Sequence, residues 1–423
     1  MEIQSALLIL VFVIGFAGIV FEHNLQVNKS WIALATGSVM WMIVSYGSSY
    51  EDLHIAIVHS SAEIFELIMF LIGAMTLVEM MAHFRFFSWI EAKLIERDIS
   101  NVKLFWILGF ITFIASALLD NLTSTLVMIQ IGRHLYIRKA NFNIYVINVV
   151  IAANAGGAMS PVGDVTTIML WLAQKFTAWE IVIKGILPSL VAWLVPQTLL
   201  TSKIKVEDRT GRKKKEILPL QWSIIIMGLS TFGLAVLVNI LHLPPFFGIL
   251  FGLGIIAIVI DLKLKKGKLK KEEGHIVNII KTIDMATIKF FVGILLAVNA
   301  LQFQGILNHV ADFIFGSDPA NNPTAIIIGH TALGLFSSIL DNVPLTAAVI
   351  KMLPEGISSI YWVLLAITAG TGGSILIIGS AAGVAAMGQV KSLTFMEYFK
   401  RGALPALLGY ISAVMTWYML FMF

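Results

Sequence analysis

Two ten-residue stretches of this chain resemble each other and lie about half its length apart, each in strongly apolar surroundings. They read SALLDNLTST at residues 116–125 and SSILDNVPLT at residues 337–346. Each places an Asp-Asn pair directly after an apolar run. A charged carboxylate inside a lipid bilayer costs several kcal/mol on an isolated helix, so a carboxylate at such a position indicates a functional site. We therefore expect both pairs to serve a function within a membrane.

The composition indicates a protein that crosses a membrane many times. Hydrophobic residues make up 58% of the 423 positions and charged residues 13%, whereas soluble domains average roughly 45–50% and about 25%. Apolar runs recur from end to end, which leaves no stretch for a separate soluble domain. The first run, residues 5–21, has no basic segment before it and no cleavage pattern after it, so we expect it to be retained as a span. Cysteine is absent, which excludes disulfides, thiolate metal sites and cysteine nucleophiles.

The apolar runs predict membrane crossings and two exceptional segments. Crossings are expected near residues 5–21, 31–46, 62–82, 142–176, 180–202, 220–241, 245–261, 284–301, 359–387 and 402–423. The segments 104–132 and 323–352 differ, because each holds its Asp-Asn pair near its centre. We predict that each is a re-entrant hairpin, which enters and leaves the membrane on one side.

The distribution of basic residues supports this topology. With both hairpins in place, 25 of the 29 Lys and Arg residues fall in loops on one face, including the basic runs at 203–215 and 263–281. Such a bias marks the cytoplasmic face. Both termini are then predicted to lie outside, and the basic runs need not imply nucleic acid.

The same topology predicts an inverted repeat. The first hairpin would open to the cytoplasm and the second to the outside, so the two halves would have opposite orientations in the membrane. We expect an all-α polytopic membrane protein with a first repeat at 1–202, a cytoplasmic basic linker at 203–219 and a second repeat at 220–423. Each repeat would hold three spans, a hairpin, a broken transmembrane helix and a final span.

The span after each hairpin is rich in helix breakers. The sequences are NAGGAMSPVGDVTT at 154–167 and GTGGSILIIGSAAG at 370–383. A proline and several glycines are expected to unwind the helix and to leave backbone carbonyls facing a cavity in the membrane. Carbonyls and the carboxylates of Asp120 and Asp164 together favour a bound cation. Alignment of the glycines pairs Asp164 with Ser380, so the site should be asymmetric.

Structural roles stay open for the same residues. Asp and Asn side chains satisfy the free N–H groups at helix ends, so the pairs at 120–121 and 341–342 are also candidate caps. Asp164 is a candidate cap of the second half-helix, although a buried charged cap is costly. Ser and Thr hydroxyls near the breaks are equally explained by hydrogen bonds to the preceding turn of their own helices.

Three glutamates in the span 62–82 are candidate proton relays. Glu63 and Glu66 share one helix face, and Glu79 lies near the predicted cytoplasmic end. The alternative is that these side chains simply extend into water at the ends of the span.

Longer motifs identify the family. ELIMFLIGAMTLVE, SALLDNLTSTLVM, NAGGAMSPVGDVTTIMLW and SSILDNVPLTAA resemble the NhaD-type sodium/proton antiporters of the ion transporter superfamily, and the resemblance covers nearly the whole chain. It implies a homodimer that exchanges cytoplasmic Na⁺, or in some members Li⁺, for external H⁺. The candidate ion- and proton-binding residues, most of them carried over by motif, are Asp120, Asn121, Asn154, Asp164, Thr166, Thr167, Ser337, Ser338, Asp341, Asn342, Thr371 and Ser374.

We expect Asp120 and Asp164 to hold either Na⁺ or Li⁺ or protons, but never both, so that activity depends steeply on pH. No cofactor is expected beyond the transported ions. The protein should lie in a plasma or inner membrane, in contact with membrane lipid and without nucleic acid.

Three other functions are weighed against this one. The first is transport of arsenite, another oxyanion or a dicarboxylate, but no Lys or Arg lies in the hairpin tips or broken stretches and the Ser-Asn-Thr motifs of dicarboxylate carriers are missing. The second is an uncoupled cation channel, against which the opposed repeats argue. An enzyme is disfavoured, because no nucleophile-and-base or metal-ligand set is present.

Overall fold

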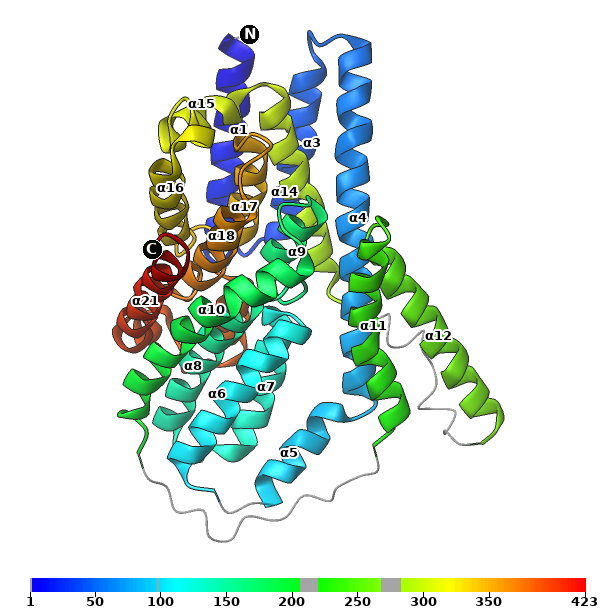
Figure 1. Cartoon of the computed structure of the whole chain (residues 1–423), viewed down its shortest axis with the longest axis vertical. Helices are drawn as coiled ribbons and strands as arrows, with labels where there is room; N and C mark the ends of the chain where they lie inside the picture. Colours follow the sequence, from blue (N-terminus) through cyan, green and yellow to red (C-terminus); the bar gives the residue numbers. More distant parts are fainter. Residues whose placement is uncertain (1, 97–98, 206–219, 268–282) are drawn as a thin grey trace. The chain divides into compact units, whose positions relative to one another are not determined.

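The chain is helical in the computed structural model (Figure 1), and no strand occurs in the part that the structure describes. The described residues are 2–96, 99–205, 220–267 and 283–423. Most of the predicted linker at 203–219 lies outside them. In this part of the chain, eight helices are long and apolar enough to cross a membrane by length and composition. The protein is therefore a multi-pass membrane protein.

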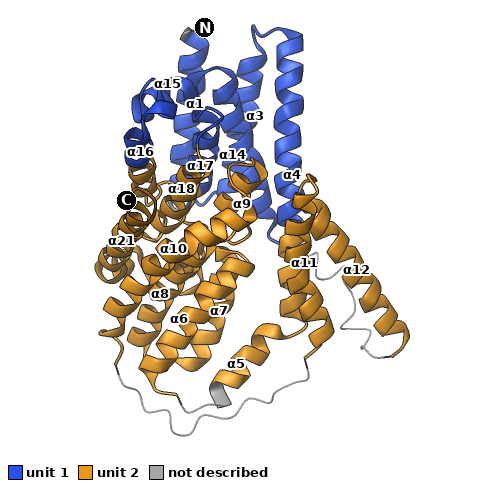
Figure 2. Ribbon diagram, viewed as in Figure 1, with its two compact units in different colours: residues 1–72, 283–329, 343–357 blue, residues 73–282, 330–342, 358–423 orange. Residues whose placement is uncertain are grey.

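The chain divides into two compact units (Figure 2). Unit 1 comprises Met1–Ile72, Ile283–Gly329 and Val343–Ile357, and unit 2 comprises Gly73–Thr282, His330–Asn342 and Ser358–Phe423. Helices α4 (Tyr50–His83), α16 (Pro323–Phe336) and α17 (Asn342–Met352) contribute residues to both units.

Unit 1 is organised around a close pair of helices. Besides its parts of the shared helices it holds α1 (Glu2–Val20), α2 (Glu22–Leu25), α3 (Lys29–Ser45), α14 (Met285–Phe303), α15 (Ile306–Phe315) and the 3₁₀ turn η2 (Pro319–Asn321). A Cβ atom added at Gly37 of α3 would lie only 2.5 Å from the Gly293 carbonyl oxygen of α14. Trp41 Nε1 donates to the Leu296 carbonyl at 2.9 Å. Glycine therefore allows the two backbones to touch, and an indole hydrogen bond fixes their register.

Unit 2 holds the remaining helices. They are α5 (Phe86–Glu96), α6 (Asn101–Leu118), α7 (Asn121–Leu135), α8 (Lys139–Gly157), α9 (Val165–Leu172), α10 (Ala178–Thr201), α11 (Trp222–Ile240), α12 (Phe246–Lys265), α18 (Ser359–Gly372), α19 (Ala381–Gln389), α20 (Phe395–Tyr398), the π-helical η3 (Phe399–Ala403) and α21 (Leu404–Phe421). Gly248 and Gly252 pack α12 onto α11, because added Cβ atoms would lie 2.5 Å from the Leu234 carbonyl oxygen and 2.4 Å from Thr231 Oγ1. This small-residue spacing serves a contact within the chain.

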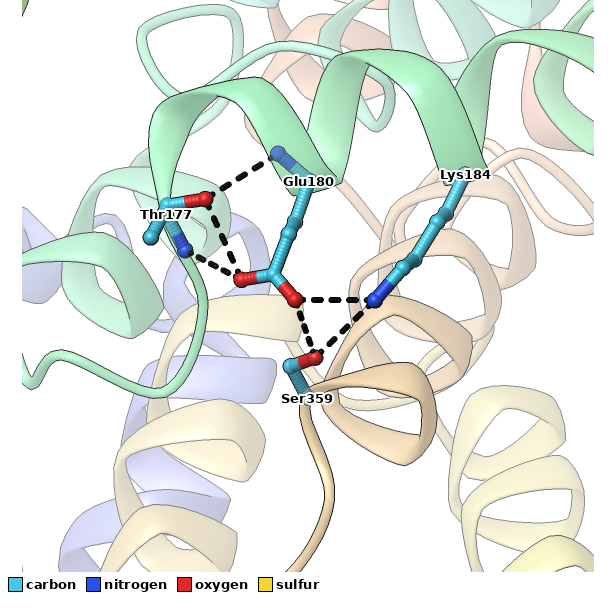
Figure 3. A network of polar contacts seen from close by, with 4 residues as sticks. All are labelled: Thr177, Glu180, Lys184 and Ser359. Atoms are coloured by element: carbon cyan, nitrogen blue, oxygen red, sulfur yellow. Dashed lines mark hydrogen bonds and ion pairs between the residues drawn. The ribbon is translucent and has the colours of Figure 1, made fainter.

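A polar network ties the start of α10 to the start of α18 in unit 2 (Figure 3). One Glu180 carboxylate oxygen accepts from the backbone N–H and hydroxyl of Thr177, at 3.0 and 3.1 Å. The other oxygen accepts from Lys184 Nζ at 2.8 Å and from Ser359 Oγ at 2.6 Å. The capping box of α10 thus doubles as a tether for the helix that leads to the second break.

The structure differs from the sequence prediction in several elements. The third predicted span, expected from residue 62, begins at Tyr50, because the preceding polar residues contain no glycine or proline that would end the helix. Helices α5 and α15 were not predicted as elements. Helix α6, predicted to be a hairpin arm, has 18 residues and is long enough to cross a membrane by itself.

Candidate functional site

Four interruptions of helices lie together in unit 2. Helix α8 ends at Gly157 and α9 begins at Val165, whereas α18 ends at Gly372 and α19 begins at Ala381. Two further breaks separate α6 from α7 and α16 from α17, at the two Asp-Asn pairs. Helices can end inside a membrane protein only where other groups satisfy the free backbone polar atoms. The side chains at these breaks therefore decide what the region can bind.

The contacts of the first pair of breaks recur at the second pair. A Cβ atom at Gly156 would lie 2.1 Å from the Phe113 carbonyl oxygen, and one at Gly372 would lie 1.9 Å from the Gly334 carbonyl oxygen. In both cases glycine lets the broken helix touch the backbone of the helix that precedes the Asp-Asn pair.

Hydrogen bonds repeat in the same way. Ser116 Oγ donates to the Ala153 carbonyl at 2.5 Å, and Ser337 Oγ donates to the Ala369 carbonyl at 2.8 Å. Ser116 and Ser337 occupy equivalent positions in the two repeated motifs. The repeat that is visible in the sequence is thus also a repeat of contacts within unit 2.

Asp164 lies at the centre of the polar contacts. Its side chain is buried, and it caps α9 with a capping box. Asp164 Oδ2 accepts from Asn121 Nδ2 and from Asn342 Nδ2, each at 3.0 Å, and Oδ1 accepts from the Thr166 backbone N–H at 3.2 Å. The two amides come from the two Asp-Asn pairs. The structure therefore brings both repeated motifs onto one carboxylate.

Asn154 links this carboxylate to the second break. Asn154 Oδ1 accepts from Asn121 Nδ2 at 3.1 Å, so Asn121 bridges Asn154 and Asp164. Asn154 Nδ2 donates to Ser374 Oγ at 2.9 Å and to Ser380 Oγ at 2.8 Å. Ser380 was not among the predicted site residues, although its alignment with Asp164 was the signal that could have found it.

The other two aspartates are the acidic members of the two Asp-Asn pairs. Asp120 caps α7, with its carboxylate oxygens accepting from the Thr123 N–H and hydroxyl, each at 2.7 Å. Its φ of 144° lies in a region that favours glycine, so its backbone is strained, as is common at functional sites. Asp341 is half-buried.

The predicted hydroxyl residues divide between local and longer-range contacts. Thr167 Oγ1 accepts from the Asp164 N–H at 3.2 Å and donates to the Asp164 carbonyl at 2.8 Å. Ser338 and Thr371 donate to backbone carbonyls three and four residues earlier in the chain. Thr166 Oγ1 is buried and has no hydrogen-bond partner among the residues that the structure describes. It is thus a buried hydroxyl two residues after Asp164.

The candidate relay glutamates are not all in one unit. In unit 1, Glu63 accepts from Lys351 Nζ at 2.5 Å and from Asn299 Nδ2 at 3.3 Å. Lys351 and Asn299 also line a cavity of about 470 Å³ in that unit. Glu66 is half-buried in unit 1, and Glu79 is half-buried in unit 2.

The two amide groups beside Asp164 can present either hydrogen-bond donors or acceptors. In the observed arrangement Asn121 and Asn342 present N–H groups to the Asp164 carboxylate. Rotation of either amide by half a turn would present its oxygen instead. A cation beside Asp164 would then find a carboxylate, amide oxygens and the Thr166 hydroxyl, which are the hard oxygen ligands that such ions prefer.

Comparison with known proteins identifies the family. The sequence matches the citrate transporter family over residues 16–370. "Sodium/proton antiporter 1" of Arabidopsis thaliana is 38% identical over 97% of this chain and 72% of its own length. "Na(+)/H(+) antiporter NhaD" of Alkalimonas amylolytica is 33% identical over 96% of this chain and 88% of its own length, and the Vibrio cholerae protein of the same name is 33% identical over 96% and 90%. The chain belongs to the NhaD-type antiporters. The family predicted from the sequence motifs is confirmed, and the chain is a transporter rather than an enzyme.

Proposed function

We propose that this NhaD-type protein is a secondary transporter that exchanges cytoplasmic Na⁺, and also Li⁺, for external H⁺ by alternating access. The observation that carries the proposal is the buried Asp164 carboxylate, on which both Asp-Asn motifs converge through Asn121 and Asn342. A single buried carboxylate with rotatable amide neighbours is suited to hold either a cation or a proton.

Competition for Asp164 couples the two ions. With Na⁺ bound, the carboxylate is charged and the surrounding oxygens serve as ligands; with H⁺ bound, the carboxyl group is neutral and needs no cation. We expect the carboxylates of Asp120 and Asp341, which belong to the two converging motifs, to add to the attraction for a cation. An exchange cycle follows if the site changes its exposure only when one of the two ions is bound.

The proposed topology is an inverted repeat with two re-entrant hairpins, in which residues 1–202 and 220–423 have opposite orientations. The repeated glycine contacts and serine hydrogen bonds of unit 2 support the repeat. Such a repeat provides two equivalent but oppositely facing arrangements, the usual basis of alternating access. External termini, a plasma or inner membrane, bound lipid and a homodimer complete this proposal.

We propose that the glutamates of α4 carry protons to the site. Glu63, Glu66 and Glu79 would relay protons, and Glu63 forms an ion pair with Lys351.

The family name favours citrate or another carboxylate as a second candidate substrate. A carboxylate ligand calls for a cationic side chain or an equivalent set of donors. The motif segments 116–125, 154–167, 337–346 and 370–383 contain no Lys or Arg, and Asp164 would repel an anion. The side-chain chemistry therefore favours the cation.

Purified protein in liposomes tests the proposal. The vesicles contain a pH dye and an acidic interior, the membrane potential is clamped, and NaCl, LiCl, KCl, choline chloride or sodium citrate is added outside. We expect internal alkalinisation with every Na⁺ or Li⁺ salt, and none with KCl or choline chloride. No response to Na⁺ or Li⁺ across the pH range, with a citrate-dependent flux, would replace this function by carboxylate transport.

A further inference from the structure

One pair of equivalent positions in the two breaks holds very different residues. The alignment of the glycine pairs places Gly370 at the position equivalent to Asn154. Asn154 extends from its own break to the other one, where its amide contacts the hydroxyls of Ser374 and Ser380. Gly370 has no side chain with which to make the reciprocal contacts.

Gly370 nevertheless lies close to the residues that a reciprocal side chain would contact. A Cβ atom added at Gly370 would lie 3.0 Å from Ala158 Cβ and 3.6 Å from Asp164 Oδ2. Ala158 and Asp164 are the residues equivalent to the two serines that Asn154 contacts. The backbone at Gly370 is thus placed as the repeat requires, but the side chain that would contact Asp164 is missing.

The place that this side chain would fill borders two oxygen atoms. Besides Asp164 Oδ2, the backbone carbonyl oxygen of Asn154 lies 3.5 Å from the added Cβ. An asparagine here would place an amide against Asp164, just as Asn154 places one against Ser380. Glycine instead places no side chain between this backbone and the carboxylate.

We infer that Gly370 is a specificity-determining residue, because its missing side chain leaves the space in which the transported cation binds against Asp164. This inference rests on the proposed function and adds where the ion binds and what limits its size. Filling the space should exclude Na⁺ before the smaller Li⁺.

The competing explanation is packing alone. The 3.0 Å approach to Ala158 would require that side chain to shift, so Gly370→Ala would lower stability even without an ion nearby. Packing alone predicts equal effects on Na⁺ and Li⁺. The ratio of the two apparent KM values therefore distinguishes the explanations, and the double change Ala158→Gly with Gly370→Ala relieves the close contact while keeping the space filled.

The test measures Na⁺- and Li⁺-driven proton exchange in liposomes for the wild-type protein, Gly370→Ala, the double variant and Gly370→Asn. Gly388→Ala in α19 is the matched control, because an added Cβ there meets no atom within 4 Å. Thermal unfolding in detergent reports folding of each variant. We expect Gly370→Ala or the double variant to raise the KM for Na⁺ about tenfold more than that for Li⁺, and Gly370→Asn to abolish exchange in folded protein, with Gly388→Ala unchanged.

Two results would overturn the inference while leaving the proposed function intact. The first is that the wild type is active and the ratio of the KM for Na⁺ to the KM for Li⁺ is the same in whichever alanine-containing variant folds. The other is exchange at wild-type KM by folded Gly370→Asn. Absence of Na⁺- and Li⁺-driven exchange in the wild type would instead remove the proposed function, and this inference with it.

Discussion

Replacement of Asp164 by Asn probes the carboxylate with little change in shape. The amide has the same size, and its oxygen can still accept from Asn121 and Asn342, which now donate to Asp164 Oδ2 at 3.0 Å each. Asn is also as good an N-cap as Asp, so the start of α9 should persist. Because an amide has a single oxygen, the variant keeps either the two asparagine contacts or the cap of α9, at a cost of about one hydrogen bond, while it removes the charge and the titratable group.

The expected loss is large. A unit charge attracts a cation about 4 Å away by about 4 kcal/mol at the effective dielectric constant typical of proteins. Loss of that attraction corresponds to a roughly thousandfold weaker affinity, since each 1.4 kcal/mol is about tenfold. We expect Asp164→Asn to show no Na⁺-driven proton movement in liposomes up to the highest usable NaCl concentration, with an unfolding temperature close to that of the wild type.

Ser380→Ala is the comparison variant, because it removes the hydroxyl that Asn154 contacts and that caps α19 at the Gly383 N–H, while leaving the three hydrogen bonds to the Asp164 carboxylate in place. It should retain exchange with an altered KM. A folded Asp164→Asn protein that still exchanges Na⁺ for H⁺ would refute the assignment of the carboxylate.

Three further predictions address the scaffold and the proton path. Gly156→Ala and Gly372→Ala should each destabilise the protein by about 1–3 kcal/mol or more, because their Cβ atoms would meet a backbone oxygen at 2.1 and 1.9 Å. Gly233→Ala, with open space around it, should not lower stability. Thermal unfolding checks all three variants, and equal stability of the three would contradict the repeated contacts. Ser359→Ala should cost about 1 kcal/mol by releasing the tether to α10, measured in the same way, and an unchanged unfolding temperature would show that the tether is not stabilising. Glu63→Gln should alter stability by less than about 1 kcal/mol, since the pair is partly exposed; we expect it to change the pH profile of exchange, and an unaltered profile would remove Glu63 as a relay.

The sequence predicts those features that depend on local chemistry. Apolar runs locate the long helices, and glycine with Pro161 indicates the region between α8 and α9 where the chain leaves the helix. The family could be read from the motifs and is confirmed by the comparisons. These features require no knowledge of what lies across the fold.

Features that depend on the register between distant helices could not be predicted in the same way. The packing of glycines against particular carbonyls sets this register. It brings Asn342 to Asp164, 178 residues away, and Asn154 to Ser380. Asp120 has one role that the structure shows, since its oxygens accept from Thr123 and cap α7, and the ligand role that the motif suggests stays a prediction. Local pattern thus indicated which residues to consider but not which of them meet.

The most direct test of competition is proton release on cation binding. Wild-type protein and Asp164→Asn in detergent and weak buffer receive NaCl, LiCl or KCl while pH is recorded, and binding is measured in parallel by calorimetry. Competition at Asp164 predicts that Na⁺ and Li⁺, but not K⁺, release protons from the wild type, that lower pH weakens Na⁺ binding, and that Asp164→Asn releases none. Na⁺ binding without proton release in the wild type, or undiminished release by folded Asp164→Asn, would contradict it.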